Sequence, residues 1–451
     1  MTLRTCLSIV LAAGLGTRMK SDLPKVMHEI GGLPLVGHVV KALRSAGSDR
    51  LAVVTGPGMP ALEALVQKLA PGAACHVQEE RLGTAHAALA ARTALLEQSD
   101  DVLILFGDTP LVTADTIGKV RAALKEGADV AVLGFETEAP FGYGRLLTEN
   151  GRLVAIREEK DATDEERGIT LCNSGIMGFR GAHALELLEA IGNNNAKSEY
   201  YLTDAVEIAN ARGLAVVAVT GTEVETQGIN TRAQLASCEA DFQARMRRAA
   251  LDEGCTLLAP ETVFFSHDTV LEPDVTVEQH VVFGPGVSVA TGARIRAFSH
   301  LEGARVGEGS VVGPYARLRP GAVLGADTRV GNFVEVKNAT FGDGAKANHL
   351  SYIGDASVGS KSNIGAGTIT CNYDGFLKHR TEIGAGSFVG SNSTLVAPVR
   401  LGEGAFVAAG SVITEDVKPD SMAFGRARQV EKAGAATELR ARLKAAKDGQ
   451  S

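Results

Sequence analysis

The first candidate for chemistry is the glycine-rich segment Leu11–Met19, which a Pro-Lys pair ending at Lys25 follows. The segment comes directly after an apolar run, so its backbone N–H groups can form a turn that cradles phosphate oxygens. Arg18 and Lys25 would supply positive charge to a phosphoryl group. The spacing Gly14-x-Gly16 lacks the third glycine of the dinucleotide fingerprint and the lysine-hydroxyl pair of the Walker loop. The pattern therefore favours phosphoryl chemistry of another kind.

A second candidate is Asp108, which follows the apolar run Val102–Phe106 and Gly107. An acidic side chain at the carboxyl end of a buried parallel strand lies where α/β enzymes bind their ligands. The alternative interpretation of Asp108 is an ordinary helix N-cap.

A third candidate is His349, in the segment Asn348–Gly354 of the C-terminal half. A neutral imidazole can take a proton from an ammonium group before the nitrogen attacks a thioester carbonyl. An isolated histidine is more often a surface residue without chemistry. Cys371 as an acyl carrier is a weaker hypothesis, because direct transfer needs no nucleophile and no base adjoins this cysteine in the sequence.

The segments that must position these residues follow two different patterns. From Leu7 to about Val219, short β-branched runs alternate with longer helix-like stretches. This alternation predicts an α/β domain with a mostly parallel sheet. The segment Arg232–Leu251 contains no glycine or proline and is rich in helix formers, so it predicts a connecting helix of about 30 Å.

Beyond this helix, aliphatic residues recur at six-residue intervals. The first run is Val306, Val312, Leu318, Leu324, Val330 and Val336, and the second is Ile383, Val389, Leu395, Leu401, Val407 and Ile413. A helix bundle or a β-sandwich would not produce this period. Three six-residue sides make a triangular coil with the aliphatic side chains inside, so the period predicts a left-handed parallel β-helix of hexapeptide repeats. Glycine after an inward position is expected to permit a tight corner, as at Gly307, Gly325, Gly331 and Gly402.

The six-residue register breaks twice, after Val336 and after Ile369. Insertions in a solenoid become surface loops, and loops on a rigid scaffold often carry function. We therefore expect one surface loop around His349 and a second one over Cys371–Thr381.

Composition limits the classes of partner. The 451 residues carry a formal net charge of -8 with both signs interspersed, which favours small-molecule substrates over nucleic acid or an anionic membrane. The apolar stretch Leu7–Ala13 is too short for a signal peptide or a membrane span, and it predicts a buried first strand. The six cysteines lie far apart without a CxxC pair, which favours a reducing, cytoplasmic location.

The segment Leu11–Met19 with its Pro-Lys pair is similar to the signature of the sugar-nucleotide pyrophosphorylases. Together with a hexapeptide half that carries Ile364–Gly375, the chain from about Leu7 to Gln429 resembles the bacterial bifunctional N-acetylglucosamine-1-phosphate uridyltransferase / glucosamine-1-phosphate acetyltransferase family. The resemblance implies that the C-terminal half acetylates glucosamine-1-phosphate with acetyl-CoA. The N-terminal half would then transfer UMP from UTP to N-acetylglucosamine-1-phosphate and release pyrophosphate.

The resemblance also implies an architecture. A Rossmann-like nucleotidyltransferase domain would cover residues 1–230, a linker helix 231–251, and a β-helix acetyltransferase domain with a C-terminal tail 252–451. The family's assembly is a homotrimer with acetyltransferase sites between the β-helices.

In the N-terminal half, the resemblance gives catalytic roles to Arg18 and Lys25 and Mg²⁺ ligation to Asp108 and Asn230. Two protein ligands suffice for Mg²⁺ where substrate phosphates and water complete its shell. The residues implied to bind UTP or UDP-N-acetylglucosamine are Leu11, Ala12, Ala13, Gly14, Lys25, Gln78, Gly83, Thr84, Phe106, Gly107, Asp108, Gly144, Glu158, Asn173 and Asn230. Taken alone, Asn173 would be interpreted as a turn residue.

In the C-terminal half, the resemblance makes His349 the catalytic base. The residues implied to bind glucosamine-1-phosphate are Arg319, Lys337, Tyr352 and Asn363. Those implied to bind acetyl-CoA are Ala366, Asn372, Tyr373, Ser391, Ala409 and Arg426. By position alone, Arg319 and Lys337 would be interpreted as solvated surface charges.

The chain departs from the family pattern at two positions beside the implied coenzyme A path. Gly425 stands where serine is usual, and Leu377 stands where asparagine is usual. The extension Ala433–Ser451 is rich in alanine and charged residues, and no role is assigned to it.

Three other functions would fit part of the sequence. They are a pyrophosphorylase whose β-helix serves only assembly or allostery, a non-enzymatic scaffold with the same domain pair, and an acyltransferase with an inert N-terminal domain. His349 argues against the first, and Arg18, Lys25 and Asp108 argue against the other two.

Overall fold

The computed structural model describes residues 4–449, which divide into two compact units. The first unit comprises residues up to 249 together with 265–267, and the second comprises 250–264 and the residues from 268 on. The predicted domain limits 1–230, 231–251 and 252–451 divide the chain by activity. The division into two compact units does not test them, so they stay a prediction.

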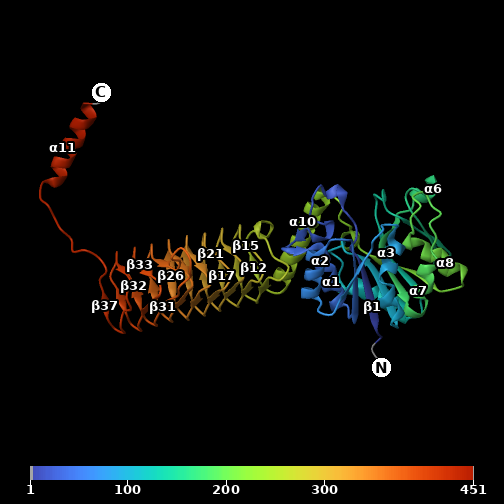
Figure 1. The fold of residues 1–451 in the computed structure, drawn as a ribbon, viewed down its shortest axis with the longest axis horizontal. Coiled ribbons are helices and arrows are strands. Elements are labelled where there is room, and N and C mark those ends of the chain that lie inside the picture. The colour runs from blue at the N-terminus through green and yellow to red at the C-terminus, as the bar shows by residue number, and fades with distance from the viewer. Residues whose placement is uncertain (1–3, 450–451) are drawn as a thin grey trace. The chain divides into compact units, whose positions relative to one another are not determined.

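A mixed sheet forms the centre of the first unit (Figure 1). Seven strands lie in the order β11-β7-β10-β6-β1-β4-β5, in which β10 is antiparallel to both neighbours and the other pairs are parallel. The hairpin β8-β9 joins this sheet at β10. The strands are β1 (Cys6–Leu11), β4 (Arg50–Thr55), β5 (Ala74–Val77), β6 (Asp101–Phe106), β7 (Val130–Glu136), β8 (Arg145–Glu149), β9 (Arg152–Arg157), β10 (Leu171–Arg180) and β11 (Val216–Gly221), with a separate small hairpin of β2 (Glu29–Ile30) and β3 (Leu33–Pro34). The predicted α/β domain with a mostly parallel sheet is confirmed.

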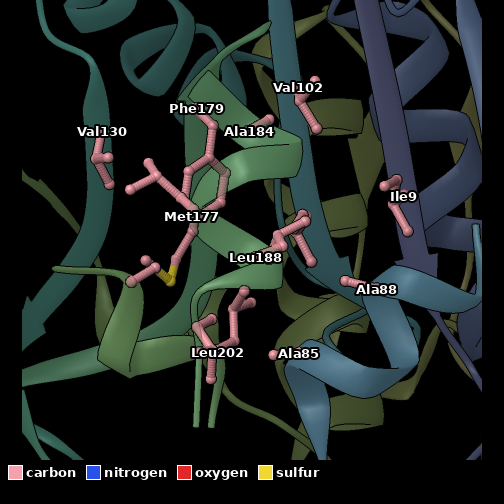
Figure 2. Close-up of a cluster of buried hydrophobic side chains, with 14 of the residues drawn as sticks. Ile9, Ala85, Ala88, Val102, Val130, Met177, Phe179, Ala184, Leu188 and Leu202 are labelled. Carbon is pink, nitrogen blue, oxygen red and sulfur yellow. The ribbon is translucent and has the colours of Figure 1, made fainter. Parts of the chain in front are cut away.

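Helices cover both faces of this sheet, because alternate side chains of each strand point to opposite faces. In β1, Leu7 and Ile9 belong to one buried cluster, whereas Val10 belongs to another. Figure 2 shows the first cluster, where Met177 and Phe179 of β10 lie near side chains of the covering helices. The helices are α1 (Leu35–Ser45), α2 (Pro60–Leu69), α3 (Thr84–Ala90), α4 (Arg92–Leu96), α5 (Ala114–Lys125), α6 (Asp164–Arg167), α7 (Gly181–Glu189), α8 (Ala205–Ala211) and α9 (Glu223–Thr226), with 3-10 turns η1 (Thr17–Met19), η2 (Lys25–Met27) and η3 (Leu202–Asp204).

The predicted connecting helix forms as α10 (Arg232–Asp252). Its side chains Cys238 and Phe242 are buried in a third cluster together with Met19 and Ile30. A Cβ at Gly31, where φ is +52, would lie 2.3 Å from Phe242 Cε1. The first half of α10 is therefore packed against the α/β fold of the first unit and is not a bare spacer.

Three parallel sheets form the sides of the second unit, and its strands stack as successive coils (Figure 1). Face 1 contains β12 (Thr256–Leu257), β14 (Thr276–Val277), β17 (Arg294–Ile295), β20 (Val311–Val312), β23 (Arg329–Asn332), β26 (Lys346–His349), β29 (Asn363–Ile364), β32 (Phe388–Val389), β35 (Phe406–Val407) and β37 (Met422–Ala423). Face 2 contains β15 (Val282–Phe283), β18 (His300–Leu301), β21 (Arg317–Leu318), β24 (Glu335–Lys337), β27 (Tyr352–Gly354), β30 (Ile369–Cys371), β33 (Thr394–Val396) and β36 (Val412–Ile413). Face 3 contains β13 (Val270–Leu271), β16 (Ser288–Val289), β19 (Ala304–Val306), β22 (Ala322–Leu324), β25 (Thr340–Phe341), β28 (Ala356–Val358), β31 (Thr381–Ile383) and β34 (Val399–Leu401), and the 3-10 turn η4 (Pro260–Thr262) lies near the start of the unit.

Both six-residue runs of aliphatic residues point into this β-helix. Every member of the two runs is 5 % exposed or less, from Val306 to Val336 and from Ile383 to Ile413. The predicted left-handed parallel β-helix of hexapeptide repeats is confirmed.

The first expected surface loop does not exist. Between Val336 and Ile353, the side chains of Phe341 and Ala347 point inward and are 3 % and 0 % exposed. The step from Val336 to Phe341 is five residues long, so one side of the coil is shortened by a residue and nothing is inserted. His349 consequently lies at the end of a paired strand, β26, and not on a loop.

The second expected loop forms, but the register before it was assigned one residue too early. Ile369 is 45 % exposed, whereas Thr370 is 1 % exposed and its Oγ1 donates to Gly354 O at 3.0 Å. The loop leaves the coil after Cys371 and returns at β31, with a bridge between Tyr373 and Lys378.

The glycines that follow inward residues serve a different purpose from the one expected. Gly307, Gly325, Gly331 and Gly402 do not have positive φ angles. A Cβ at Gly307 would instead lie 2.4 Å from Gly325 O of the next coil, and one at Gly331 would lie 2.0 Å from Asn348 O. These glycines permit close approach of stacked backbones, and not tight corners.

Beyond the β-helix, α11 (Ala435–Asp448) has no buried residue. It occupies most of the extension Ala433–Ser451, of which residues 450–451 lie outside the described part. Within residues 4–449, no helix combines the length and apolar character that crossing a membrane requires.

Candidate functional site

The glycine-rich turn connects β1 to η1 and is shaped by one obligatory glycine. Gly16 has φ +63, and a Cβ there would lie 2.5 Å from the Cβ of Lys25. A Cβ at Gly14 would meet no atom within 4 Å. The turn is thus closed against Lys25 at one point and has open space beside its backbone at the other.

A cavity of about 740 Å³ adjoins this turn at the carboxyl ends of β1 and β6. Arg18 lines it, together with the predicted residues Leu11, Ala12, Ala13, Gly14, Lys25, Gln78, Gly83, Thr84, Phe106, Asp108, Asn173 and Asn230. Gly107 is the exception beside β6, because it is buried and its N–H donates to Leu11 O at 2.9 Å. This edge of the sheet is where α/β proteins bind ligands.

Four side chains converge within the cavity. Lys25 Nζ donates to Asp108 Oδ2 and, at 3.1 Å, to Asn230 Oδ1. Arg18 Nη2 donates to the same Asn230 Oδ1 at 2.8 Å. The side chains of Lys25 and Asp108 are only 15 % and 14 % exposed, so their attraction is screened less than that of a surface pair.

Backbone contacts position the two oxygen donors of this group. Ile229 N donates to Asp108 O at 3.0 Å, which joins the segment before α10 to the end of β6. Asn230 N donates to Oε1 of Gln234, in the first turn of α10, at 2.8 Å. Residues 122 positions apart in the sequence are thereby held beside each other.

The side chain of Gln78 is only 4 % exposed, and its amide nitrogen contacts two residues that follow it in the sequence. Its Nε2 donates to Gly83 O at 3.3 Å and lies 3.1 Å from His86 Nδ1. Gly83 has φ +121, and a Cβ there would lie 2.5 Å from Tyr200 O. Glycine is therefore required at position 83 both for conformation and for packing.

The sequence did not identify Arg81, which lines the same cavity. Its Nε donates to Ala13 O at 2.9 Å, so the side chain lies across the glycine-rich turn. A basic residue between Gln78 and Gly83, two predicted contact residues, was the available signal.

A second cavity, of about 260 Å³, shares Thr84, Phe106 and Asn173 with the first. Gly144 and Glu158 line this smaller cavity as well. Asn173 N donates to Gly144 O at 2.7 Å. All three predicted sugar-contact residues are therefore brought together.

Further polar groups of the smaller cavity were missed in the sequence. Thr203 Oγ1 donates to Glu158 Oε1 at 3.3 Å. Tyr201 is 8 % exposed, and its hydroxyl has no hydrogen-bond partner within residues 4–449. Both residues precede α8 in a segment whose sequence has no motif, so only the packing of the segment against β9 and α3 identifies them.

Burial and crowding of carboxylates change the acidities around this cavity. Burial raises the pKa of Glu158 above its ordinary value. Burial and nearby carboxylates, with Asp161 and Glu199 the largest of these, raise the pKa of Tyr201 to about 12. Burial, with Glu207 and Glu158, raises the pKa of Asp204 to about 6. The carboxyl groups in and around this cavity are thus harder to ionise than usual, and Lys197 is the cation that lines the cavity beside Glu158.

On the β-helix, His349 faces a separate cavity of about 410 Å³. Its Nδ1 lies 2.6 Å from Oδ1 of Asn332, the residue paired with it on the preceding coil. The cavity is also lined by Arg294, Arg296 and Arg329. Glu278 lies 2.9 Å from Arg294 and 3.8 Å from Arg296.

The predicted sugar-phosphate residues lie on two different faces. Arg319, Lys337 and Tyr352 belong to face 2, whereas Asn363 belongs to face 1. Arg319 Nη1 donates to Glu335 Oε1 at 2.8 Å, so this guanidinium is paired along its own face. The two basic residues therefore share face 2 with Tyr352, whereas Asn363 belongs to a different face.

Lys337 belongs to a buried polar network centred on Asp355. The ammonium of Lys337 lies 3.7 Å from the carboxylate, which accepts hydrogen bonds from Asn338 Nδ2, at 2.6 Å, and from Asn372 Nδ2. Burial opposes ionisation of Asp355, but the two amides and Lys337 outweigh it and hold its pKa below the ordinary value. The side chain of Asn372 therefore binds Asp355 at the start of the loop.

The remaining predicted coenzyme A residues follow one edge of the β-helix. Ala366 O accepts from Asn392 N at 2.7 Å, and Ser391 O accepts from Gly410 N at 2.8 Å, which stacks Ala366, Ser391 and Ala409 on successive coils. Arg426 follows at the next level, since Val412 N donates to Gly425 O at 3.0 Å. Tyr373 is 61 % exposed, on the loop.

Comparisons with known proteins agree with both architectures. The family model described as "MobA-like NTP transferase domain" matches residues 8–170, and the model "Bacterial transferase hexapeptide (six repeats)" matches residues 303–338 and 380–415. A "Bifunctional protein GlmU" of Azorhizobium caulinodans is 59% identical over 98% of this chain and 98% of its own length. Proteins of the same name are 58% identical in a Chelativorans species, over 100% of both chains, and 56% identical in Agrobacterium fabrum, over 99% of both.

Proposed function

The chain belongs to the GlmU family of bifunctional enzymes that make UDP-N-acetylglucosamine, and from that premise we propose which residues carry its two reactions. Uridylyl transfer takes place in the cavity of the first unit, and acetyl transfer takes place on the β-helix around His349. The convergence of Arg18, Lys25, Asp108 and Asn230 beside an open glycine-rich turn is the observation that carries the proposal.

In uridylyl transfer, a phosphate oxygen of N-acetylglucosamine-1-phosphate attacks the α-phosphorus of UTP. The bond from this phosphorus to the oxygen of the β-phosphate breaks, and pyrophosphate leaves. The protein supplies no nucleophile, so its task is to position two anions and to offset their charge. Arg18 and Lys25 offset that charge, and the backbone N–H groups around Gly14 bind phosphate oxygens.

Mg²⁺ fits the oxygen donors of this cavity. A single ammonium, that of Lys25, contacts both Asp108 Oδ2 and Asn230 Oδ1, so the two oxygens face a common point. Within residues 4–449, no cluster of three or more His, Cys, Asp or Glu side chains could hold a metal, so phosphates and water would complete the shell. The bound ion would neutralise phosphate charge as the leaving group departs.

The two connected cavities divide the substrate. Gln78, Gly83 and Thr84 bind the nucleotide at one end, where the buried amide of Gln78 can pair with the edge of uracil. Gly144, Glu158 and Asn173 bind the sugar in the smaller cavity, whose buried carboxylate accepts hydrogen bonds from sugar hydroxyls.

In acetyl transfer, His349 removes a proton from the ammonium group of glucosamine-1-phosphate, and the neutral nitrogen attacks the thioester carbonyl of acetyl-CoA. The carbon-sulfur bond breaks, and coenzyme A leaves as the thiolate, which takes up the proton that the nitrogen loses as the amide forms. Arg319 and Lys337 bind the sugar phosphate. The edge from Ala366 to Arg426 binds coenzyme A, with Tyr373 on the loop beside it.

A homotrimer completes this second site. Face 1, with Asn363, and face 2, with Arg319 and Tyr352, point in different directions on a triangular coil. One chain cannot aim all of these side chains at one sugar phosphate. A neighbouring copy that brings its face 1 against face 2 can do so, and three copies close such a contact into a ring.

The substrates of the proposal are small molecules, UTP, sugar phosphates and acetyl-CoA, with no nucleic acid and no membrane as partner. The six cysteines are free thiols, which supports a reducing, cytoplasmic location.

A paired assay tests both assignments in one preparation. Thiol release from acetyl-CoA with glucosamine-1-phosphate reports acetyl transfer, and pyrophosphate release from UTP with N-acetylglucosamine-1-phosphate reports uridylyl transfer. Both activities are expected, and absence of either one from the folded full chain would contradict the corresponding assignment.

A further inference from the structure

We propose that Asn332 is a positioning residue of acetyl transfer, which holds the imidazole of His349 in the tautomer whose Nε2 accepts the proton. The inference rests on the proposed role of His349 as base. It adds a residue, from a different coil, that decides which ring nitrogen can do this work.

The two side chains are held together by an unusually long strand pair. Most strands of face 1 have two residues, but β23 and β26 have four each and pair up to Asn332 and His349. Gly331 makes this approach possible, since a Cβ there would lie 2.0 Å from Asn348 O. The contact between Asn332 Oδ1 and His349 Nδ1, at 2.6 Å, therefore forms at a fixed place.

The backbone fixes both residues from the other side as well. Phe333 and Leu350, the next residues of each strand, have φ +54 and +51. Leu350 N donates to Asn332 O at 3.0 Å, and the ring of Phe333 stacks on that of Tyr315. The backbones of Asn332 and His349 are therefore held at the edge between faces 1 and 2.

The chemistry of the contact determines the tautomer. A carbonyl oxygen only accepts hydrogen bonds, so Oδ1 requires a proton on Nδ1. A neutral imidazole carries one proton, which leaves the lone pair on Nε2. The other tautomer would place its proton on Nε2 and leave no acceptor for the amino group of the sugar.

A neutral partner also suits the charges that face His349. The cavity is lined by Arg294 of β17, Arg296 after it and Arg329 of β23, and Lys346 begins the strand of His349. Glu278 lies beside the first two arginines. A carboxylate at position 332 would orient the ring equally well, but it would stabilise the imidazolium, which cannot act as base.

Two substitutions separate orientation from charge. Asn332→Leu is expected to lower kcat of acetyl transfer about tenfold to hundredfold, with KM for acetyl-CoA changed less than about twofold. This loss lies at or below the lower limit of about 10²-fold for removal of a general base, because the base itself remains. Asn332→Asp is expected to keep most of the rate at high pH, with the acidic limb of the pH profile moved upward by about one unit. Uridylyl transfer in the same preparation reports the fold, and Asn332→Ser replaces Asn332→Leu if that variant does not fold.

Nitrogen NMR of ring-labelled protein gives a readout that a purely structural role would not move. The signal of His349, assigned by its loss in His349→Ala, is expected to report a protonated Nδ1 in the wild type and a mixture of tautomers in Asn332→Leu. A wild-type ring protonated on Nε2, or a leucine variant with unchanged tautomer and kcat, would overturn the inference. Full acetyl transfer in His349→Ala would instead overturn the proposed base itself.

Discussion

The ammonium group of Lys25 donates a hydrogen bond to the carboxylate of Asp108. The same ammonium contacts Asn230, so it lies between the two oxygens proposed for Mg²⁺. The ammonium of Lys25 and a bound Mg²⁺ would therefore compete for the same position. A displaced Lys25 could instead bind the phosphate oxygens of the nucleotide.

We predict that Lys25→Met binds Mn²⁺ more tightly than the wild type in the absence of nucleotide, while uridylyl transfer falls. Two unit charges about 4 Å apart repel by about 4 kcal/mol at an effective dielectric of 20, so a gain of at least about tenfold is expected. Electron paramagnetic resonance of free Mn²⁺ measures the affinity. Lys20→Met, an exposed lysine nearby, is the matched control, and equal Mn²⁺ affinity in Lys25→Met and wild type would contradict the competition.

The two activities should be separable, because their residues lie in different compact units. Asp108→Ala is expected to abolish uridylyl transfer and to leave acetyl transfer near normal, and His349→Ala is expected to do the reverse. The paired assay on each variant measures both. Loss of both activities in a folded variant would refute the assignment to two sites.

Acetyl transfer should fail at acid pH, because an imidazolium cannot accept the proton of the amino group. Uridylyl transfer should lack this acidic limb, since no histidine is proposed to take part in that reaction. Rates of the two reactions between pH 5 and 9 provide the check, and an identical limb in both would count against His349.

Stability of the first unit should depend on the ionisation of Asp204. Its pKa is raised from 3.8 to about 6, so ionisation opposes folding: the penalty is absent below about pH 4 and complete above about pH 6. Asp204→Asn is therefore expected to stabilise the unit by about 1 to 2 kcal/mol at pH 8, after allowance for partial exposure, and not at pH 4. Urea unfolding at both pH values measures this, with the fully exposed Asp164→Asn as control.

Gly425→Ser, which places here the serine that the family resemblance implies, should destabilise this chain. A Cβ at position 425 would lie 2.1 Å from Val412 O, and relief of such a clash typically costs about 1 to 3 kcal/mol. Leu377→Asn, at a position 64 % exposed, should be neutral. Thermal unfolding of the two variants distinguishes these outcomes, and a more stable serine variant with a lower KM for acetyl-CoA would contradict the prediction.

The alternation of strands and helices was enough to predict the α/β fold, and the six-residue period was enough to predict the β-helix. Each pattern buries its apolar side chains well in one kind of architecture. A six-residue period can bury its aliphatic side chains only in a stacked coil, and the register from Val306 to Val336 shows it without error. The predicted register was wrong where the inward side chain is not aliphatic, and where two successive inward residues are five instead of six positions apart. Thr370 is polar, and its hydroxyl finds a partner inside the coil, while Phe341 arrives after five residues.

The pair Asn332 and His349 was missed for the same reason. Their separation of 17 residues is one coil with a shortened side, but the apparent break suggested a loop and concealed the register. Arg81 and Tyr201 could not be found by periodicity at all, because their place depends on contacts between distant segments. Sequence motifs can identify candidate binding residues. The residues that orient them come from distant segments, so only the packed structure identifies them.

The hydrogen bond between Asn230 N and the side chain of Gln234 bears on how this protein could be divided. Gln234 Oε1 also accepts from Thr231 N at 3.0 Å, so the first turn of α10 holds the loop that carries a proposed metal ligand. An excised N-terminal half that stopped at residue 230 would keep every predicted contact residue and lose the support of one of them. A fragment or a chimaera that is joined beyond this turn would keep that support, so the first turn of α10 belongs with the N-terminal half in any such design.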